Sequence, residues 1–95
     1  MNRTEFETEC HTQGYHEIVD RRMDANTTKP EHSHEFDARL LVLEGEMTIT
    51  REGSAHLYRA GDAFAMTAGC LHTERSGPEG ARYLAGRRYQ HGAKS

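Results

Sequence analysis

The sequence contains only two cysteines, Cys10 and Cys70, and they lie far apart. Their spacing forms no C-x-x-C pair, so it gives no support for a zinc ribbon, and two distant thiols do not make the disulfide framework of a small secreted domain. The first five residues are polar and acidic and lack the apolar core of a secretory signal. These features predict a reduced, cytoplasmic protein.

Long apolar runs and concentrated positive charge are also lacking. The longest apolar run is four residues, at 40–43, far below the roughly 20 that a membrane-spanning helix needs. The twelve lysines and arginines are scattered and are outnumbered by fifteen acidic residues, so no surface for nucleic-acid phosphates is expected. We therefore expect neither a membrane nor a nucleic acid as a partner.

Hydrophobic residues are scarce overall. The mean hydropathy of −0.88, together with nine glycines in 95 residues, indicates one turn-rich domain with a thin core. A second copy of such a chain would bury additional surface, so we expect a homodimer. Histidine, in contrast, is abundant, with seven in the chain.

One helix is predicted, followed by a series of short strands. Residues 3–13 should form the helix because Phe6 and Cys10 are four positions apart and Gly14 follows as a C-cap glycine. The remaining chain alternates apolar stretches with turns, at the spacing of an antiparallel sandwich or small barrel. The expected strands are 15–19, 38–44, 47–50, 55–58, 63–66, 71–74 and 81–89.

The breaks between these strands are marked by glycine, proline and small polar residues. They are expected at 24–28, where a loop ends at Pro30, and at 44–45, 51–54, 60–62, 68–69 and 76–80. Residues 91–95 are expected to be a flexible tail.

His32 and His34 form an H-x-H pair before the apolar run at 40–43. In an extended segment, side chains at positions i and i+2 project from the same face, so both imidazoles would point into one space. Imidazole is the commonest metal ligand at neutral pH, and two of them supply half of a four-ligand shell. The alternative is a pair of histidines that only form hydrogen bonds within a cavity.

The segment from Gly61 to His72 supplies a second pattern. His32 and His34 followed by Gly45, and then Gly61 followed by Gly69 and His72, resemble the two sequence motifs of the cupin superfamily. Thr67 stands where the second motif usually has proline. The resemblance extends over about residues 29–90.

The resemblance implies an all-β fold, a small double-stranded β-helix or jelly-roll barrel, here preceded by the short N-terminal helix. Residues 1–28 would then hold this helix and the first strand leading into the barrel, and residues 29–90 would form the barrel core. The resemblance also implies that His32, His34 and His72 converge on one divalent transition metal in the barrel mouth.

One ligand of the family is missing. Ala38 occupies the position of the family's metal-binding glutamate, and a methyl group cannot bind a metal. Three neutral histidines can still hold a divalent ion, and two carboxylates could replace the missing one. Asp37 would lie on the opposite face of its strand unless a bulge turns it. Glu74, two residues after His72, shares the face of that histidine.

We therefore prefer Glu74, either as a fourth ligand or as a catalytic general base beside an open coordination position. The alternative is that Glu74 is a rim residue paired with Arg75 or Arg82. Iron, nickel, zinc, manganese and copper all suit such a donor set.

Together these features indicate a metal-binding cupin with a small-molecule pocket, possessing dioxygenase- or isomerase-type activity on a substrate that the sequence does not identify. The alternative is a non-catalytic cupin that binds or senses a ligand and has a degenerate metal site. A purely structural barrel is a third reading, since the fold alone does not decide whether the protein is an enzyme.

Overall fold

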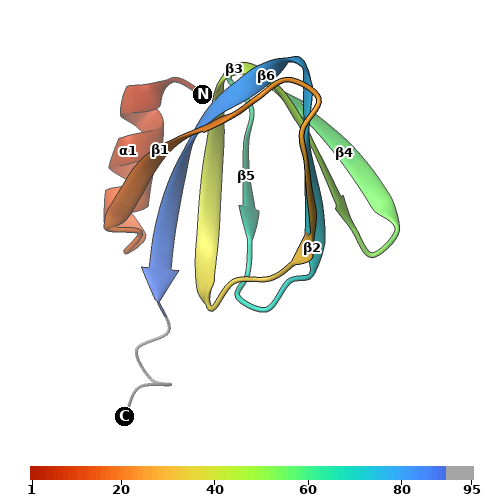
Figure 1. The fold of residues 1–95 in the computed structure, drawn as a ribbon. Helices are drawn as coiled ribbons and strands as arrows, with labels where there is room; N and C mark the ends of the chain where they lie inside the picture. Colours follow the sequence, from red (N-terminus) through yellow and green to blue (C-terminus); the bar gives the residue numbers. More distant parts are fainter. Residues whose placement is uncertain (90–95) are drawn as a thin grey trace.

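A computed structural model describes residues 1–89, which form one helix and six strands (Figure 1). The elements are α1 (Arg3–Thr12), β1 (Glu17–Met23), β2 (Thr28–His32), β3 (Phe36–Arg51), β4 (Ser54–Arg59), β5 (Ala63–Met66) and β6 (His72–Tyr89). No helix in this range is long and apolar enough to cross a membrane. The tail expected at 91–95 lies outside the described residues.

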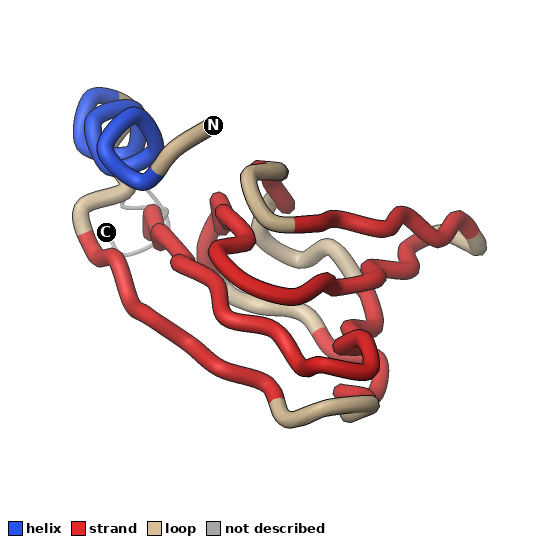
Figure 2. Tube along the Cα trace, turned by 90° about the horizontal axis from the view of Figure 1, so that it is seen from above, coloured by secondary structure: helices blue, strands red, loops and turns tan. Residues whose placement is uncertain are grey.

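The two longest strands, β3 and β6, pair with each other at the centre of the sheet. β1 and β2 pair with successive parts of β6, while β5 and β4 pair with successive parts of β3, and every pairing is antiparallel. Viewed from above, the strands curve around a common interior (Figure 2). This is the double-stranded β-helix predicted from the sequence.

Two of the expected breaks are bulges within these long strands, so the predictions of a turn at 44–45 and a loop at 76–80 were wrong. The β3–β6 register shifts between Val42 and Glu44 and again between Gly45 and Met47. Gly45 and Gly80, at φ +72° and +77°, adopt a left-handed conformation that glycine reaches without a steric penalty. A bulge of this kind bends a strand without ending it. The four strands expected at 38–44, 47–50, 71–74 and 81–89 are therefore two.

The strand β2 was not predicted, because a proline after the polar segment 24–28 is typical of the end of a loop. Pro30 lies inside β2, within the irregular register between Lys29 and His32. β2 pairs only with β6, and an edge strand tolerates the missing proline N–H. The first strand, expected at 15–19, runs instead from Glu17 to Met23.

The expected helix is present and covers the outer face of the sheet (Figures 1 and 2). Its Asn2 cap and Glu5 form a reciprocal capping box. Phe6 and Cys10 are fully buried, in one cluster with Leu41 of β3. Burial raises the pKa of the Cys10 thiol.

The apolar run at 40–43 is continuous because β3 is buried on both faces. Leu40 and Val42 point into the barrel interior, whereas Leu41 packs beneath the helix. The interior cluster consists of Met23, Ala38, Leu40, Val42, Met47, Ile49, Phe64, Met66, Ala81 and Tyr83. The three predicted histidine ligands and Glu74 lie at one end of this interior.

Candidate metal centre

The three predicted histidine ligands lie together at one end of the barrel. His32 ends β2 and is the register partner of His72 at the start of β6. His34 lies in the loop before β3, where its carbonyl oxygen accepts a hydrogen bond of 2.9 Å from the N–H of Gly69. This bond joins the loop after β2 to the turn that leads into β6. The three rings have centroid separations between 4.4 and 5.4 Å.

Glu74 completes the cluster. Its Oε2 lies 3.0 Å from Nε2 of His72 and 3.2 Å from Nε2 of His32. Inward and outward residues alternate along the start of β6, so the side chains at 72 and 74 share the interior face. One ligand atom from each of the four residues lies within 4.8 Å of the others. Both His72, 1% exposed, and Glu74, 4% exposed, are removed from water.

Asp37, the other candidate carboxylate, is not part of this cluster. It is buried, forms an ion pair of 3.0 Å with Arg88, and accepts a hydrogen bond of 2.9 Å from the N–H of Ala68. Asp37 therefore anchors the turn that precedes β6. Of the two carboxylates weighed from the sequence, the structure brings only Glu74 to the histidines.

The rim alternative for Glu74 also disagrees with the structure. Arg82 forms ion pairs with Asp20 and Glu44 instead, and Arg75 is exposed while Glu74 is buried. Glu74 points into the barrel because it lies an even number of residues from His72 along β6.

Hydrogen bonds fix two of the imidazoles. Nδ1 of His32 lies 2.7 Å from the carbonyl oxygen of Pro30, and Nδ1 of His72 lies 2.9 Å from that of Cys70. A carbonyl oxygen can only accept, so each Nδ1 carries a hydrogen, which leaves Nε2 as the nitrogen available to bind a metal. Metal-binding histidines are usually held in this way, by a backbone carbonyl on the ring nitrogen that does not bind the metal.

The cluster brings two imidazole nitrogens to one buried carboxylate. Nε2 of His32 and Nε2 of His72 face one oxygen of Glu74, and the second oxygen, Oε1, is buried with no hydrogen-bond partner among the described residues. The Lys29 ammonium lies 3.8 Å from Oε1, beyond hydrogen-bonding distance. Burial lowers the pKa of His34, and His32 and His72 lower it further, which favours the neutral, metal-binding form of this imidazole. These donors therefore fit a divalent cation.

A cavity of about 140 Å³ opens beside the cluster. Its lining consists of Arg21, Lys29, His32, His34, Phe36, Ala38, Leu40, Met66, Glu74, Tyr83, Ala85 and Arg87. Since a water molecule occupies about 30 Å³ in the liquid, the cavity holds roughly four or five waters or a molecule of few atoms. Ala38 contributes only a methyl group to the wall. The three basic residues of the lining were not identified from the sequence, where no motif marks them.

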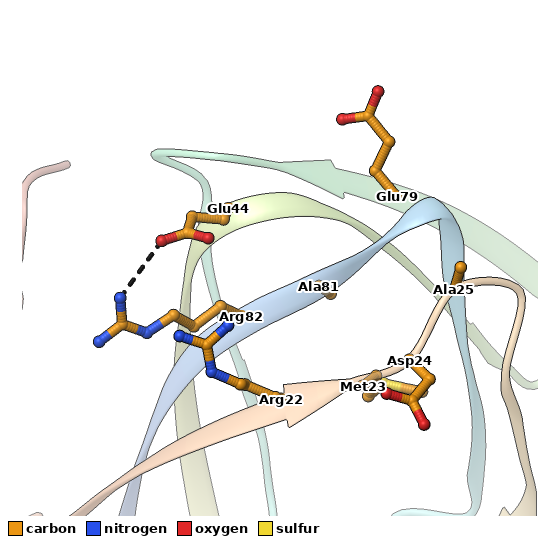
Figure 3. Close-up of a pocket in the computed structure, with 8 residues that line it drawn as sticks. All are labelled: Arg22, Met23, Asp24, Ala25, Glu44, Glu79, Ala81 and Arg82. Carbon is orange, nitrogen blue, oxygen red and sulfur yellow. Dashed lines mark hydrogen bonds and ion pairs between the residues drawn. The ribbon is translucent and has the colours of Figure 1, made fainter.

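A larger pocket of about 250 Å³ lies elsewhere on the molecule (Figure 3). It is lined mainly by charged side chains, and Arg82 is bound there to Glu44 at 3.2 Å. It contains no histidine or cysteine, and its lining shares no residue with the cavity beside the cluster. We therefore assign the candidate site to the smaller cavity.

Comparison with solved structures supports the fold. A protein of unknown function from Rhizobium leguminosarum is similar, with a TM-score of 0.73 and 23% identity over 77% of this chain and 69% of that one. An RmlC-like cupin from Shewanella frigidimarina has a TM-score of 0.68 and 20% identity over 82% and 69%. A cupin superfamily protein from Desulfitobacterium hafniense has a TM-score of 0.67 and 15% identity over 79% and 80%.

A search of curated proteins finds no match. The family model for the cupin domain, however, matches residues 20–85, which is most of the chain. This match agrees with the motif resemblance and with the architecture. The chain belongs to the cupin family.

Proposed function

We propose that this cupin binds a divalent transition metal through His32, His34, His72 and Glu74, and that the cavity beside them receives a small molecule. One observation carries the proposal. Nε2 of His32 and Nε2 of His72 both face the buried carboxylate of Glu74, while their Nδ1 atoms are held by carbonyl oxygens. The Lys29 ammonium, 3.8 Å from Oε1, is the ion-pair partner of this carboxylate, and Oε2 is left to the two imidazoles.

A bound metal would supply Lewis-acid chemistry or, for iron and copper, redox chemistry. Iron, nickel, zinc, manganese and copper remain the candidates, because imidazole with one carboxylate suits all of them. A dioxygenase- or isomerase-type reaction is the enzymatic form of the proposal. In it, Glu74 acts as the catalytic base beside an open coordination position instead of as a fourth ligand, and Oε1, which has no hydrogen-bond partner among the described residues, accepts or returns the proton.

A non-catalytic cupin that binds or senses a ligand is the second candidate. The observation favouring it is Ala38, which lines the cavity with a methyl group at the position where the family motif has its metal-binding glutamate. The enzymatic form requires the metal, whereas the second candidate, with its degenerate metal site, does not, so metal content comes first. Turnover of the bound molecule then separates them.

Elemental analysis of the purified, untagged protein tests the metal site. We expect close to one transition-metal ion per chain, either as purified or after addition of Fe(II), Ni(II) or Zn(II) followed by gel filtration. A tag must be absent, because its histidines would bind metal themselves. Metal far below one per chain after such loading would overturn the proposal.

Glu74→Gln tests the fourth ligand. The substitution preserves the volume of the side chain but removes the negative charge that faces the two Nε2 atoms. We expect metal affinity to fall by about 10-fold or more, by analogy with the loss of groups that support a metal site. The measurement is a competition titration against a chromogenic chelator.

Glu31→Gln is the matched control for this variant. Glu31 lies on β2 next to His32, is exposed, and is outside the ligand cluster. It should leave the affinity unchanged. Equal affinities for the Glu74 and Glu31 variants would remove Glu74 from the ligand set.

A further inference from the structure

The cavity beside the ligand cluster has a lining rich in positive charge, which the metal site alone does not explain. Three basic side chains, Arg21, Lys29 and Arg87, line it with a single carboxylate, that of Glu74. The chain as a whole has a net charge of −3, so this concentration is local. Positive charges disfavour a metal cation nearby unless an anion also binds.

The basic residues come from three different strands, and the sheet register directs them to one place. Arg21 of β1 lies opposite Tyr83, Lys29 of β2 lies opposite Glu74, and Arg87 of β6 lies opposite Ala38. Each partner also lines the cavity. Side chains directly opposite each other in an antiparallel pair share a face of the sheet. The pairing of the strands therefore brings these three positive charges to the cavity, although the residues are distant in the sequence.

These cations retain unused hydrogen-bonding capacity. The guanidinium of Arg21 has no ion pair or hydrogen bond among the described residues, although its backbone lies in the β1–β6 ladder. Arg87 pairs with Glu17 at 3.2 Å and stacks on the ring of Phe36, yet its Nε is buried without a partner. Lys29 donates one long hydrogen bond of 3.4 Å to the hydroxyl of Tyr83. An anion in the cavity would satisfy these donors.

We propose that the cavity is a subsite for a small carboxylate with a short apolar chain. The proposal names the ligand class of the same site and therefore rests on the proposed function. Arginine matches a carboxylate because its planar fork donates two parallel hydrogen bonds. The remaining wall is apolar, formed mainly by Phe36, Leu40 and Met66, and it suits a short carbon chain better than a fully polar oxyanion. The volume of about 140 Å³ limits the enclosed part of the ligand to a few atoms.

Propionate is the probe, and propionamide is its neutral counterpart of nearly the same shape. Binding to the zinc-loaded protein is followed by NMR chemical-shift titration at low ionic strength. We expect propionate to bind with saturable shifts at residues of the cavity, and propionamide to bind at least about 10-fold more weakly, as loss of charge-assisted hydrogen bonds implies. Equal binding of the two, or the absence of propionate binding, would overturn the proposal.

Arg21→Gln and Arg22→Gln form a matched pair of variants. Both residues are exposed on β1, but Arg22 lines the pocket of Figure 3 and not this cavity. Arg21→Gln should weaken propionate about 5-fold or more with metal content unchanged, whereas Arg22→Gln should leave propionate binding as it is. Equal effects of the two variants would show that only net charge matters and would refute the subsite.

Two further results separate this inference from the proposed metal site. Stoichiometric metal without charge-selective propionate binding rejects the carboxylate subsite alone. Propionate binding that depends on Arg21 in a protein that retains no metal supports the subsite and rejects the metal site. Inorganic phosphate is titrated in parallel, and binding of phosphate as tight as that of propionate would reject a carboxylate as the ligand class.

Discussion

His72→Ala should remove the metal from the protein while leaving the β-sheet in place. His72 is 1% exposed, and its Nε2 lies 3.0 Å from Glu74 at the centre of the cluster. Groups that merely support metal ligands already contribute 10- to 100-fold to affinity. The loss of a ligand itself should therefore weaken binding by more than about 100-fold. The measurement is metal per chain after gel filtration, with far-UV circular dichroism recorded on the same sample.

His56→Ala is the control for this experiment, because His56 is exposed on β4 and lies outside the cluster. His72→Ala also opens a cavity and leaves the Cys70 carbonyl without its donor, which could unfold the chain. His32→Ala then provides the test, since that side chain is 30% exposed and its removal disturbs less packing. Unchanged metal content in both cluster variants would refute the histidine site.

The composition of the ligand cluster could be predicted because strand geometry is local. Residues two apart in an extended chain share a face, and this rule alone brings Glu74 to His72. The family resemblance then brings the H-x-H pair and His72 to one place, and in the structure His32 pairs with His72 and the ring of His34 lies beside both. The roles of these four residues as metal ligands and of Glu74 as a base stay predictions, as do the homodimer and the cytoplasmic location.

The basic side of the cavity could not be predicted, because register between distant segments brings it together. Arg21 and Arg87 are 66 positions apart (87 − 21) in a chain whose basic residues are scattered. On a strand, a charged residue normally indicates a solvent-facing side. Only the pairing of β1 and β6 shows that these two arginines line the same interior as His34 and Ala38.

The full lengths of β3 and β6 were also not predicted, for a different reason. Glycine and proline at 76–80 are typical of a loop, and Glu44-Gly45 is typical of a turn. Whether a glycine ends a strand or bends it depends on what lies across from it. Gly45 pairs with Ala81 and lies against the carbonyl of Gly80, so the irregularities of the two strands meet in one bend of the β3–β6 pair.

Gly45→Ala tests this bend and should destabilise the protein strongly. A Cβ atom at position 45 would overlap the carbonyl oxygen of Gly80, and the residue would be held at φ +72°. The obstacle is backbone at the centre of the sheet, so relief requires the β3–β6 pair to separate. We expect the free energy of unfolding to fall by about 3 kcal/mol or more, in the range of severe backbone strain and overpacking. In a domain of this size, that corresponds to a decrease in Tm of about 12 °C or more.

Gly53→Ala is the matched control, because it separates overlap from backbone conformation. Gly53 has nearly the same φ, +78°, in the turn between β3 and β4, but a Cβ atom there would meet nothing within 4 Å. The free energy of unfolding of this variant should therefore fall only by the cost of placing alanine in the left-handed conformation, about 1–2 kcal/mol. Chemical denaturation of both variants gives the comparison. Equal losses of unfolding free energy in the two variants would mean that the bulge at Gly45 accommodates a Cβ atom easily. The close contact between Gly45 and Gly80 would then not be what maintains the bend of the barrel.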